Sequence, residues 1–265
     1  SLLEHVVSPR YLAGVKDQKS GHLHPLKYTL GLAKAAQEMG VDLFEESPVQ
    51  NWSGKDEVSL LLPNAALKTN YLVLAGNAYL GSLDKKLSQR LMPVGTFMIA
   101  TEPLGSTRAG QLLPENSAVA DINFVLDYFR LSADQRLLFG GGVSYSTIPP
   151  VNVRSYLKKR MLKVFPFLDD VELKYGWGGL VGITMNRMPN FGRLAPNVFL
   201  AQGFSGHGVA LTGLAGKLMA EVISGTAERF DVMSRVPHLP FPGGHLFRMP
   251  ALILGTTWYR LRDLL

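Results

Sequence analysis

The 265-residue sequence contains no cysteine, which excludes disulfides, thiolate zinc sites and a cysteine nucleophile. It also lacks any run approaching the ~18 consecutive apolar residues of a membrane span. Residues 1–10 include Glu4, His5 and Pro9 where a signal peptide would have an apolar core. The lack of cysteine does not fix the compartment but is compatible with a reducing one. We expect a cytoplasmic protein with no integral membrane segment.

Two familiar site motifs are missing as well. A nucleophile elbow needs Gly-x-Ser-x-Gly, but the residue two positions after Ser205 is His207. A dinucleotide fingerprint needs a third glycine three residues after the second, and Gly206 and Gly208 are followed by Leu211. Neither a serine hydrolase nor a self-contained pyrophosphate loop is predicted.

The composition is that of a globular protein, with 46% hydrophobic and 18% charged residues. The net charge of +6 comes from 27 basic and 21 acidic residues spread along the chain. A nucleic-acid-binding protein would show clustering, so we expect no nucleic-acid partner. The dense run Lys158-Lys159-Arg160 fits a solvated helix face, and the histidines and carboxylates show no metal-ligand spacing, so no metal site is predicted.

The most informative stretch is the glycine-rich turn Gly203-Phe204-Ser205-Gly206-His207-Gly208. An apolar strand is predicted before it at residues 198–201, and a helix after it at residues 209–223 that stops at Ser224-Gly225. This arrangement aims backbone N–H groups and the positive end of a helix dipole at one point. The turn is a candidate seat for an electron-rich atom; the alternative is a tight turn with no ligand. The His207 side chain either adds a hydrogen-bond donor or a positive charge for the ligand, or only caps the helix or packs at the turn.

The remaining pattern predicts a mixed α/β chain. A helix begins at Pro25 and ends at Gly40, with one apolar face formed by Tyr28, Leu32, Ala35, Ala36 and Met39. Strands are predicted at residues 41–49, 58–62 and 68–75, with a turn at 51–56. The apolar run 71–75 is typical of a strand covered on both faces.

After residue 93, short strands at residues 95–102, 123–131 and 136–140 indicate an antiparallel sheet. A helix at residues 154–165 is stopped by Pro166, and residues 175–184 return to extended chain. The tail at residues 235–265 either packs on the body of the protein or forms an amphipathic interfacial helix.

Several stretches together resemble the D-amino-acid-oxidase-type family of flavin oxidoreductases, nearest its gamma-glutamylputrescine-oxidising branch. These stretches are Ser20-Gly21-His22-Leu23-His24-Pro25, residues 71–78, residues 93–104, residues 137–142, Trp177-Gly178-Gly179-Leu180, Met188-Pro189-Asn190-Phe191-Gly192 and residues 203–208.

The resemblance implies a partial Rossmann-like FAD/NAD(P)-binding domain combined with an antiparallel-sheet substrate domain. Residues 1–92 would be the remainder of the FAD-binding domain, and residues 93–175 the substrate domain. Residues 176–234 would return to the FAD-binding domain, and residues 235–265 form the tail. The family's Gly-x-Gly-x-x-Gly segment is absent and the chain opens on Ser1, so we expect that an N-terminal segment is missing.

The resemblance also implies FAD as cofactor and assigns its contacts. Residues matching Val49, Ala75 and Gly76 lie near the adenine and ribose in that family, and the stretch containing Trp177 and Gly179 borders the active site. The predicted flavin contacts in the turn are Gly203, Phe204, Ser205, Gly206, His207, Gly208 and Val209. The predicted substrate slot is lined by Tyr128, Phe129 and Trp177, for each of which core packing is the alternative.

The implied reaction is oxidation of a C–N bond of an amine by hydride transfer to the flavin, with oxygen or another electron acceptor. Relatives that oxidise amino acids carry a Lys just after the glycine-rich turn to hold the substrate carboxylate. Val209-Ala210 stands there instead, which favours a gamma-glutamylputrescine-like amine. No catalytic acid or base is assigned. The alternative is a non-catalytic C-terminal fragment that binds a partner chain and no flavin by itself.

Overall fold

A computed structural model describes residues 2–123, 125–144, 152–242, 250 and 253–254. The chain divides into two compact units, each described by itself. The first combines the stretch that ends at Thr29 with Gly95–Gly179 and residues 253–254, and the second combines Leu30–Val94 with the described residues from Leu180 to residue 250. No helix among the described residues is long and apolar enough to cross a membrane.

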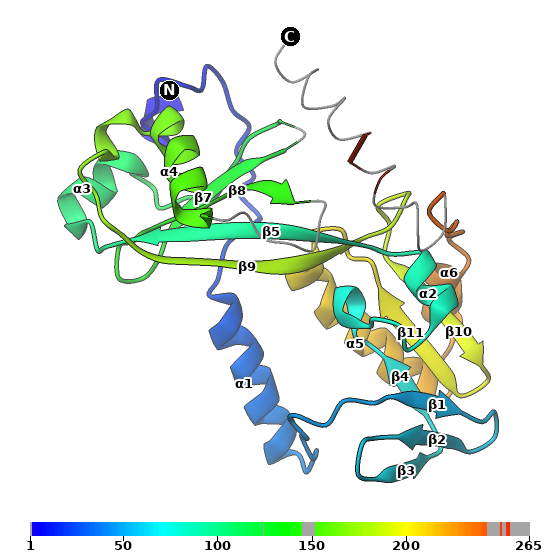
Figure 1. The fold of residues 1–265 in the computed structure, drawn as a ribbon. Helices are drawn as coiled ribbons and strands as arrows, with labels where there is room; N and C mark the ends of the chain where they lie inside the picture. Colours follow the sequence, from blue (N-terminus) through cyan, green and yellow to red (C-terminus); the bar gives the residue numbers. More distant parts are fainter. Residues whose placement is uncertain (1, 124, 145–151, 243–249, 251–252, 255–265) are drawn as a thin grey trace. The chain divides into compact units, whose positions relative to one another are not determined.

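The first unit is built on a sheet with strand order β6-β7-β8-β5-β9 (Figure 1). Its strands are β5 (Met92–Thr101), β6 (Val119–Ala120), β7 (Asp127–Leu131), β8 (Leu137–Ser144) and β9 (Leu173–Ile183). The pairings β5·β8, β6·β7 and β7·β8 are antiparallel, as the sequence predicts. The helices are η1 (Leu2–Glu4), α3 (Gly105–Leu112), α4 (Val153–Val164) and η3 (Pro166–Leu168).

Helix α4 shows how local sequence shapes this unit. The side-chain oxygen of Asn152 accepts a hydrogen bond from the Ser155 N–H at 2.9 Å, which caps the helix. Leu157, Met161 and Val164 repeat at helical spacing and are buried. The helix therefore lays one apolar stripe into the core.

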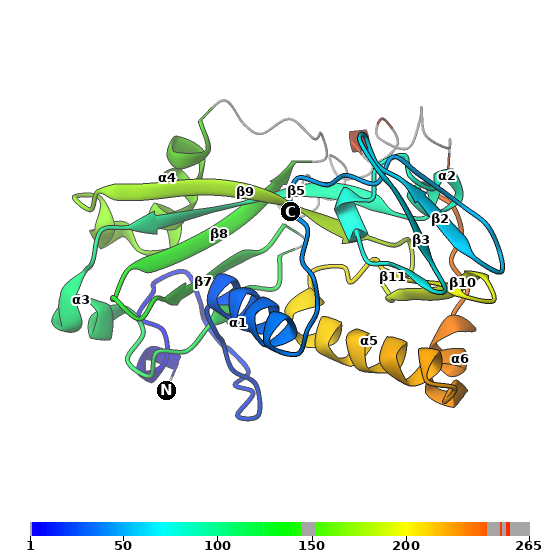
Figure 2. The ribbon, with the colours of Figure 1, turned by 90° about the horizontal axis from the view of Figure 1, so that it is seen from below.

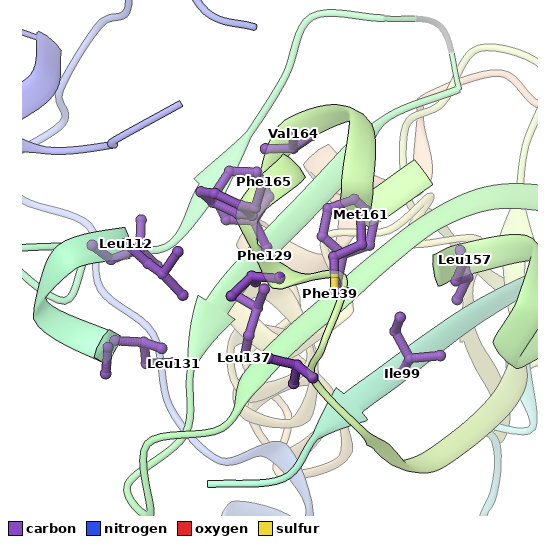
Figure 3. Close-up of a cluster of buried hydrophobic side chains, with 14 of the residues drawn as sticks. Ile99, Leu112, Phe129, Leu131, Leu137, Phe139, Leu157, Met161, Val164 and Phe165 are labelled. Carbon is purple, nitrogen blue, oxygen red and sulfur yellow. The ribbon is translucent and has the colours of Figure 1, made fainter. Parts of the chain in front are cut away.

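Aromatic rings form the centre of that core (Figure 3). The Phe129 ring stacks on Phe139 at 5.8 Å between centroids and meets Phe165 edge-on at 5.0 Å. Such arrangements suit the ring quadrupoles.

The second unit contains two three-stranded sheets. One is the antiparallel set β1 (Asn51–Ser53), β2 (Val58–Leu61) and β3 (Ala66–Thr69). The other has the order β10-β11-β4, formed by β10 (Asn190–Ala195), β11 (Val198–Gln202) and β4 (Leu72–Leu74). Strand β11 pairs antiparallel with β10 and parallel with β4.

Helix α5 (Gly208–Ile223) lies along the β10-β11-β4 sheet (Figure 2). Its buried residues Ala215, Leu218, Met219 and Val222 share a cluster with Phe199 of β11 and Phe230 of α6 (Glu228–Ser234). The other described helices that lie wholly in this unit are η2 (Asn77–Tyr79) and α2 (Lys85–Gln89). The boundary between the two units falls within α1 (Pro25–Glu38), which contains no buried residue.

Four predictions about secondary structure are wrong. Residues 41–49 form no strand, since Glu46 has a left-handed φ of 50° and Pro48 follows it. The predicted turn at 51–56 begins with strand β1, and the predicted strand at 68–75 is two strands in different sheets. The strand predicted from residue 123 begins at Asp127.

The prediction that residues 71–75 are buried on both faces is also wrong within the described chain, because Tyr71 and Val73 are exposed. Helices α2, α3 and α6 were not predicted. The predicted helix and strand boundaries at residues 58–62, 154–165, 198–201 and 209–223 are confirmed to within a few residues. Of the tail, residues 243–249, 251–252 and 255–265 lie outside the described residues.

Candidate functional site: the turn between β11 and α5

The chain passes from β11 into α5 through three left-handed residues. Gly203 has φ 74°, Ser205 has φ 51° and Gly206 has φ 94°. A Cβ on Gly203 would clash with the Thr184 side chain, whereas a Cβ on Gly206 would meet nothing within 4 Å. Gly203 is thus required by packing, and Gly206 leaves open space at the turn.

Some of the amides predicted to face a ligand are used within the protein. The Ser205 N–H donates to the Gly182 carbonyl at 3.0 Å, and the His207 N–H donates to the Phe204 carbonyl at 2.9 Å. The Gly203 N–H donates to Asn77 Oδ1 at 2.8 Å. The amides of Gly203, Ser205 and His207 are therefore not available to a ligand, because these bonds hold the shape of the turn itself.

Four other amides lack a partner among the described residues: those of Gly206, Gly208, Val209 and Ala210. The first backbone bond of α5 runs from the Leu211 N–H to the His207 carbonyl at 3.1 Å, which leaves the first-turn donors unused. Gly206, Val209 and Ala210 are exposed. These donors and the helix dipole present a positive, accessible face.

His207 occupies the N-cap position of α5, but its side chain makes no capping hydrogen bond. The ring is exposed. The capping alternative is therefore not what the structure shows, and the imidazole is free to contact a ligand at the turn. Phe204 is buried and belongs to the cluster beneath α5.

The residues predicted near the adenine and ribose lie together in the same unit. Val49, Ala75 and Gly76 line one cleft of about 330 Å³, with Trp52 and Tyr79 among the other lining residues. Ala75 and Gly76 directly follow β4, at the carboxyl end of a parallel strand, where ligands of open α/β sheets bind. A Cβ on Gly76 would point at the Leu80 backbone, 3.1 Å away, so this glycine also permits the turn that follows.

Trp177 and Gly179 lie in the first unit, on β9. The Trp177 side chain is 45% exposed, so its ring is available to a ligand. A Cβ on the intervening Gly178 would lie 2.7 Å from the Phe97 ring. The lack of a side chain at Gly178 therefore allows β9 to lie close to the Phe97 ring.

Tyr128 and Phe129 are neighbours on β7 and point to opposite faces of the sheet. The Tyr128 ring is half-buried and occupies the space that the missing side chain of Gly140 leaves. Burial raises the pKa of its hydroxyl, opposed by a hydrogen bond with Thr96. Phe129 is only 2% exposed and lies in the aromatic core. It therefore packs in the core and does not line a substrate slot.

A second cleft of about 490 Å³ was not predicted. It is lined by Arg90, Arg193, Arg235, His238 and Asn190, among others. Burial lowers the pKa of His238, and the nearby positive charge of Arg90 lowers it further. Arg193 is already engaged, since it pairs with Asp231 at 2.9 Å. No group of three or more possible metal ligands occurs in the described part of the chain.

The model of the FAD dependent oxidoreductase family DAO matches residues 2–222 of the chain. The chain is 42% identical over 264 residues to gamma-glutamylputrescine oxidoreductase of Escherichia coli, covering 99% of this chain and 62% of that protein. It is 41% identical over 267 residues to the probable oxidoreductase OrdL of Haemophilus influenzae, covering 99% of this chain and 61% of that protein.

Among solved structures, glycine oxidase from Geobacillus kaustophilus superposes with a TM-score of 0.68 at 21% identity. That match covers 79% of this chain and 57% of the other. Such a match shows a shared fold, as the resemblance predicts.

The chain spans 62% of the length of its Escherichia coli relative. The family match nevertheless includes both the predicted nucleotide cleft and the turn before α5. The chain belongs to the DAO family of FAD-dependent oxidoreductases.

Proposed function

We propose that the protein oxidises a C–N bond of an amine with FAD as cofactor, the turn before α5 facing the flavin ring. The observation that carries this proposal is the set of open amide donors at Gly206 and at the first three residues of α5. With FAD bound, these fixed donors would stabilise the negative charge that develops on the ring as it is reduced.

The residues present fit FAD at two places. The cleft beside Val49, Ala75 and Gly76 has room and an apolar wall for the adenine and ribose end. The turn offers donors with no side chain in front of Gly206. When bound, FAD supplies the acceptor for a hydride from the carbon next to the amine nitrogen, and oxygen or another acceptor restores it.

The open amides of α5 would stabilise negative charge on a bound ligand more strongly than the dipole of the helix. A helix dipole contributes ~0.3–2 kcal/mol, whereas one aimed donor in a water-excluded site contributes ~2.7–4 kcal/mol. The Gly206 and Gly208 amides lie closest to the turn and are the strongest candidates. His207 would add a further donor from the same side.

The substrate proposal is an amine related to gamma-glutamylputrescine. One relative is named for that activity at 42% identity. Val209 and Ala210 are both exposed and carry no charge, so the start of α5 has no ammonium group to hold a carboxylate beside the reacting carbon. Trp177 and Tyr128 are the proposed apolar contacts.

We further propose that a preceding segment of the complete protein completes the nucleotide site. Strand β4 pairs with β11 alone within the described chain, and both Tyr71, directly before it, and Val73, within it, are exposed. A three-stranded sheet with an open parallel edge is suited to receive another strand. Helix α1 likewise exposes Leu26, Leu30 and Leu32, an apolar surface that a further element would cover.

The test is spectroscopic and enzymatic. The complete protein should purify with flavin absorption in the visible and lose that absorption when gamma-glutamylputrescine is added without oxygen. Glycine and sarcosine, in which a carboxylate is bonded to a carbon that bears the nitrogen, should leave the spectrum unchanged. Absence of flavin under all conditions would instead identify a non-catalytic chain, and bleaching by glycine would contradict the amine assignment.

A further inference from the structure

One side chain joins the predicted adenine cleft to the turn before α5. Asn77 directly follows Gly76, which lines the cleft, and begins η2. Its Oδ1 accepts a hydrogen bond from the Gly203 N–H at 2.8 Å, across 126 residues of sequence. Asn77 has a left-handed φ of 46°, a conformation that asparagine tolerates better than most residues.

The same oxygen lies against β9. A Cβ on Gly182 would clash with Asn77 Oδ1, so the absence of a side chain there is what allows the contact. The Gly182 carbonyl in turn accepts the Ser205 N–H at 3.0 Å. Asn77, Gly182 and the turn thus form one hydrogen-bonded unit around Gly203.

Tyr79 adds a second connection from η2. Its hydroxyl accepts a hydrogen bond from the Leu180 N–H at 3.0 Å. One three-residue helix therefore ties both β9 and the turn to the end of β4. Gly76, which lines the cleft, is thus bonded covalently to the residue whose side chain contacts the turn.

We infer that Asn77 is a positioning residue that holds the turn in the shape that leaves the Gly206 and Gly208 amides open. This inference rests on the proposed flavin site. Asn77 contacts the turn and acts on the cofactor only through it. Gly203 is buried, so loss of the Asn77 acceptor would leave its N–H unsatisfied, and the turn would rearrange to find another partner.

Two variants separate the side chain from the backbone. Asn77→Gly removes the acceptor while making the left-handed φ easier to adopt. Asn77→Asp keeps an oxygen in the same position and a residue type that tolerates this φ. Amide exchange by NMR at Gly203 and Ser205 reads the turn directly, and exchange at Met161 of α4, in the other unit, reports any general loss of stability.

In Asn77→Gly, exchange at Gly203 should be about tenfold faster, with Met161 unchanged, and the FAD dissociation constant should rise by about tenfold. In Asn77→Asp, the exchange rate at Gly203 and the FAD dissociation constant should both stay within about twofold of the values for the original protein.

Unchanged exchange at Gly203 in Asn77→Gly would overturn the inference, as would equal damage in Asn77→Asp. Faster exchange with an unaltered FAD dissociation constant would also overturn it, since the turn would then move without consequence for the cofactor. If the original protein binds no FAD, the proposed function fails, and the exchange result shows separately whether Asn77 holds the turn.

Discussion

Gly206 and Gly225 form a matched pair that separates a ligand-facing glycine from a merely conformational one. Gly206 has φ 94° and Gly225 has φ 96°, and a Cβ on either would meet nothing within 4 Å. They lie beyond the two ends of the 16-residue helix α5, which is about 24 Å long at 1.5 Å per residue. Only Gly206 adjoins the open amides.

The two Ala substitutions should cost similar stability. A left-handed conformation costs a non-glycine residue ~1–2 kcal/mol, and neither site adds a clash. For a protein of this size each variant should lower Tm by ~2–8 °C. Gly206→Ala additionally places a methyl group where a ring must approach the backbone, so it should weaken FAD binding at least ~10-fold, or ~1.4 kcal/mol.

The assay is titration of each purified variant with FAD, followed by quenching of flavin fluorescence, beside thermal unfolding of the same samples. Equal loss of stability with weakened FAD binding in Gly206→Ala alone supports the assignment. Equal FAD affinity in both variants would refute it, because the space before Gly206 would then be empty of flavin.

Three further predictions test the fold and its charges. Gly203→Ala should destabilise by ~2–5 kcal/mol in denaturant unfolding, since strain at φ 74° adds to a clash with Thr184; a cost as small as that of Gly206→Ala would contradict this packing. Phe139→Ala should cost ~3–5 kcal/mol because the ring is fully buried, whereas Phe167→Ala, at a ring 47% exposed, should cost much less. His238 has a pKa lowered by burial, so the unfolded chain takes up its proton first, and stability should fall as pH drops below ~6.5. His238→Gln should remove that part of the pH dependence, and an unaltered slope would show that other groups cause it.

The local sequence predicts those elements whose apolar period and terminators agree. Helix α5 has both, from Ala215, Leu218 and Val222 along one face to Gly225 at the end, whose φ is 96°. The residues before Asn51 alternate in polarity like a strand, but Glu46 and Pro48 interrupt the extended backbone. The spacing of apolar residues therefore predicts an element less reliably by itself than together with a residue that ends the element.

Pairings between distant segments are beyond the reach of local pattern. The run around Tyr71 reads as one strand, yet it belongs to two sheets because β4 pairs with β11, more than a hundred residues later. The contact of Asn77 with Gly203 has the same character. The only local signal for Asn77 is a polar residue that tolerates a left-handed φ directly after Gly76, which is too common to single out a functional role.

The most direct measurement is amide exchange across the turn before and after FAD is added. The account predicts slower exchange at Gly206, Gly208, Val209 and Ala210, whose donors are open, and little change at Ser205 and His207, whose donors are already bonded. Slower exchange confined to the bonded amides, or no change at the open ones while FAD is bound, would contradict the placement of the flavin at this turn.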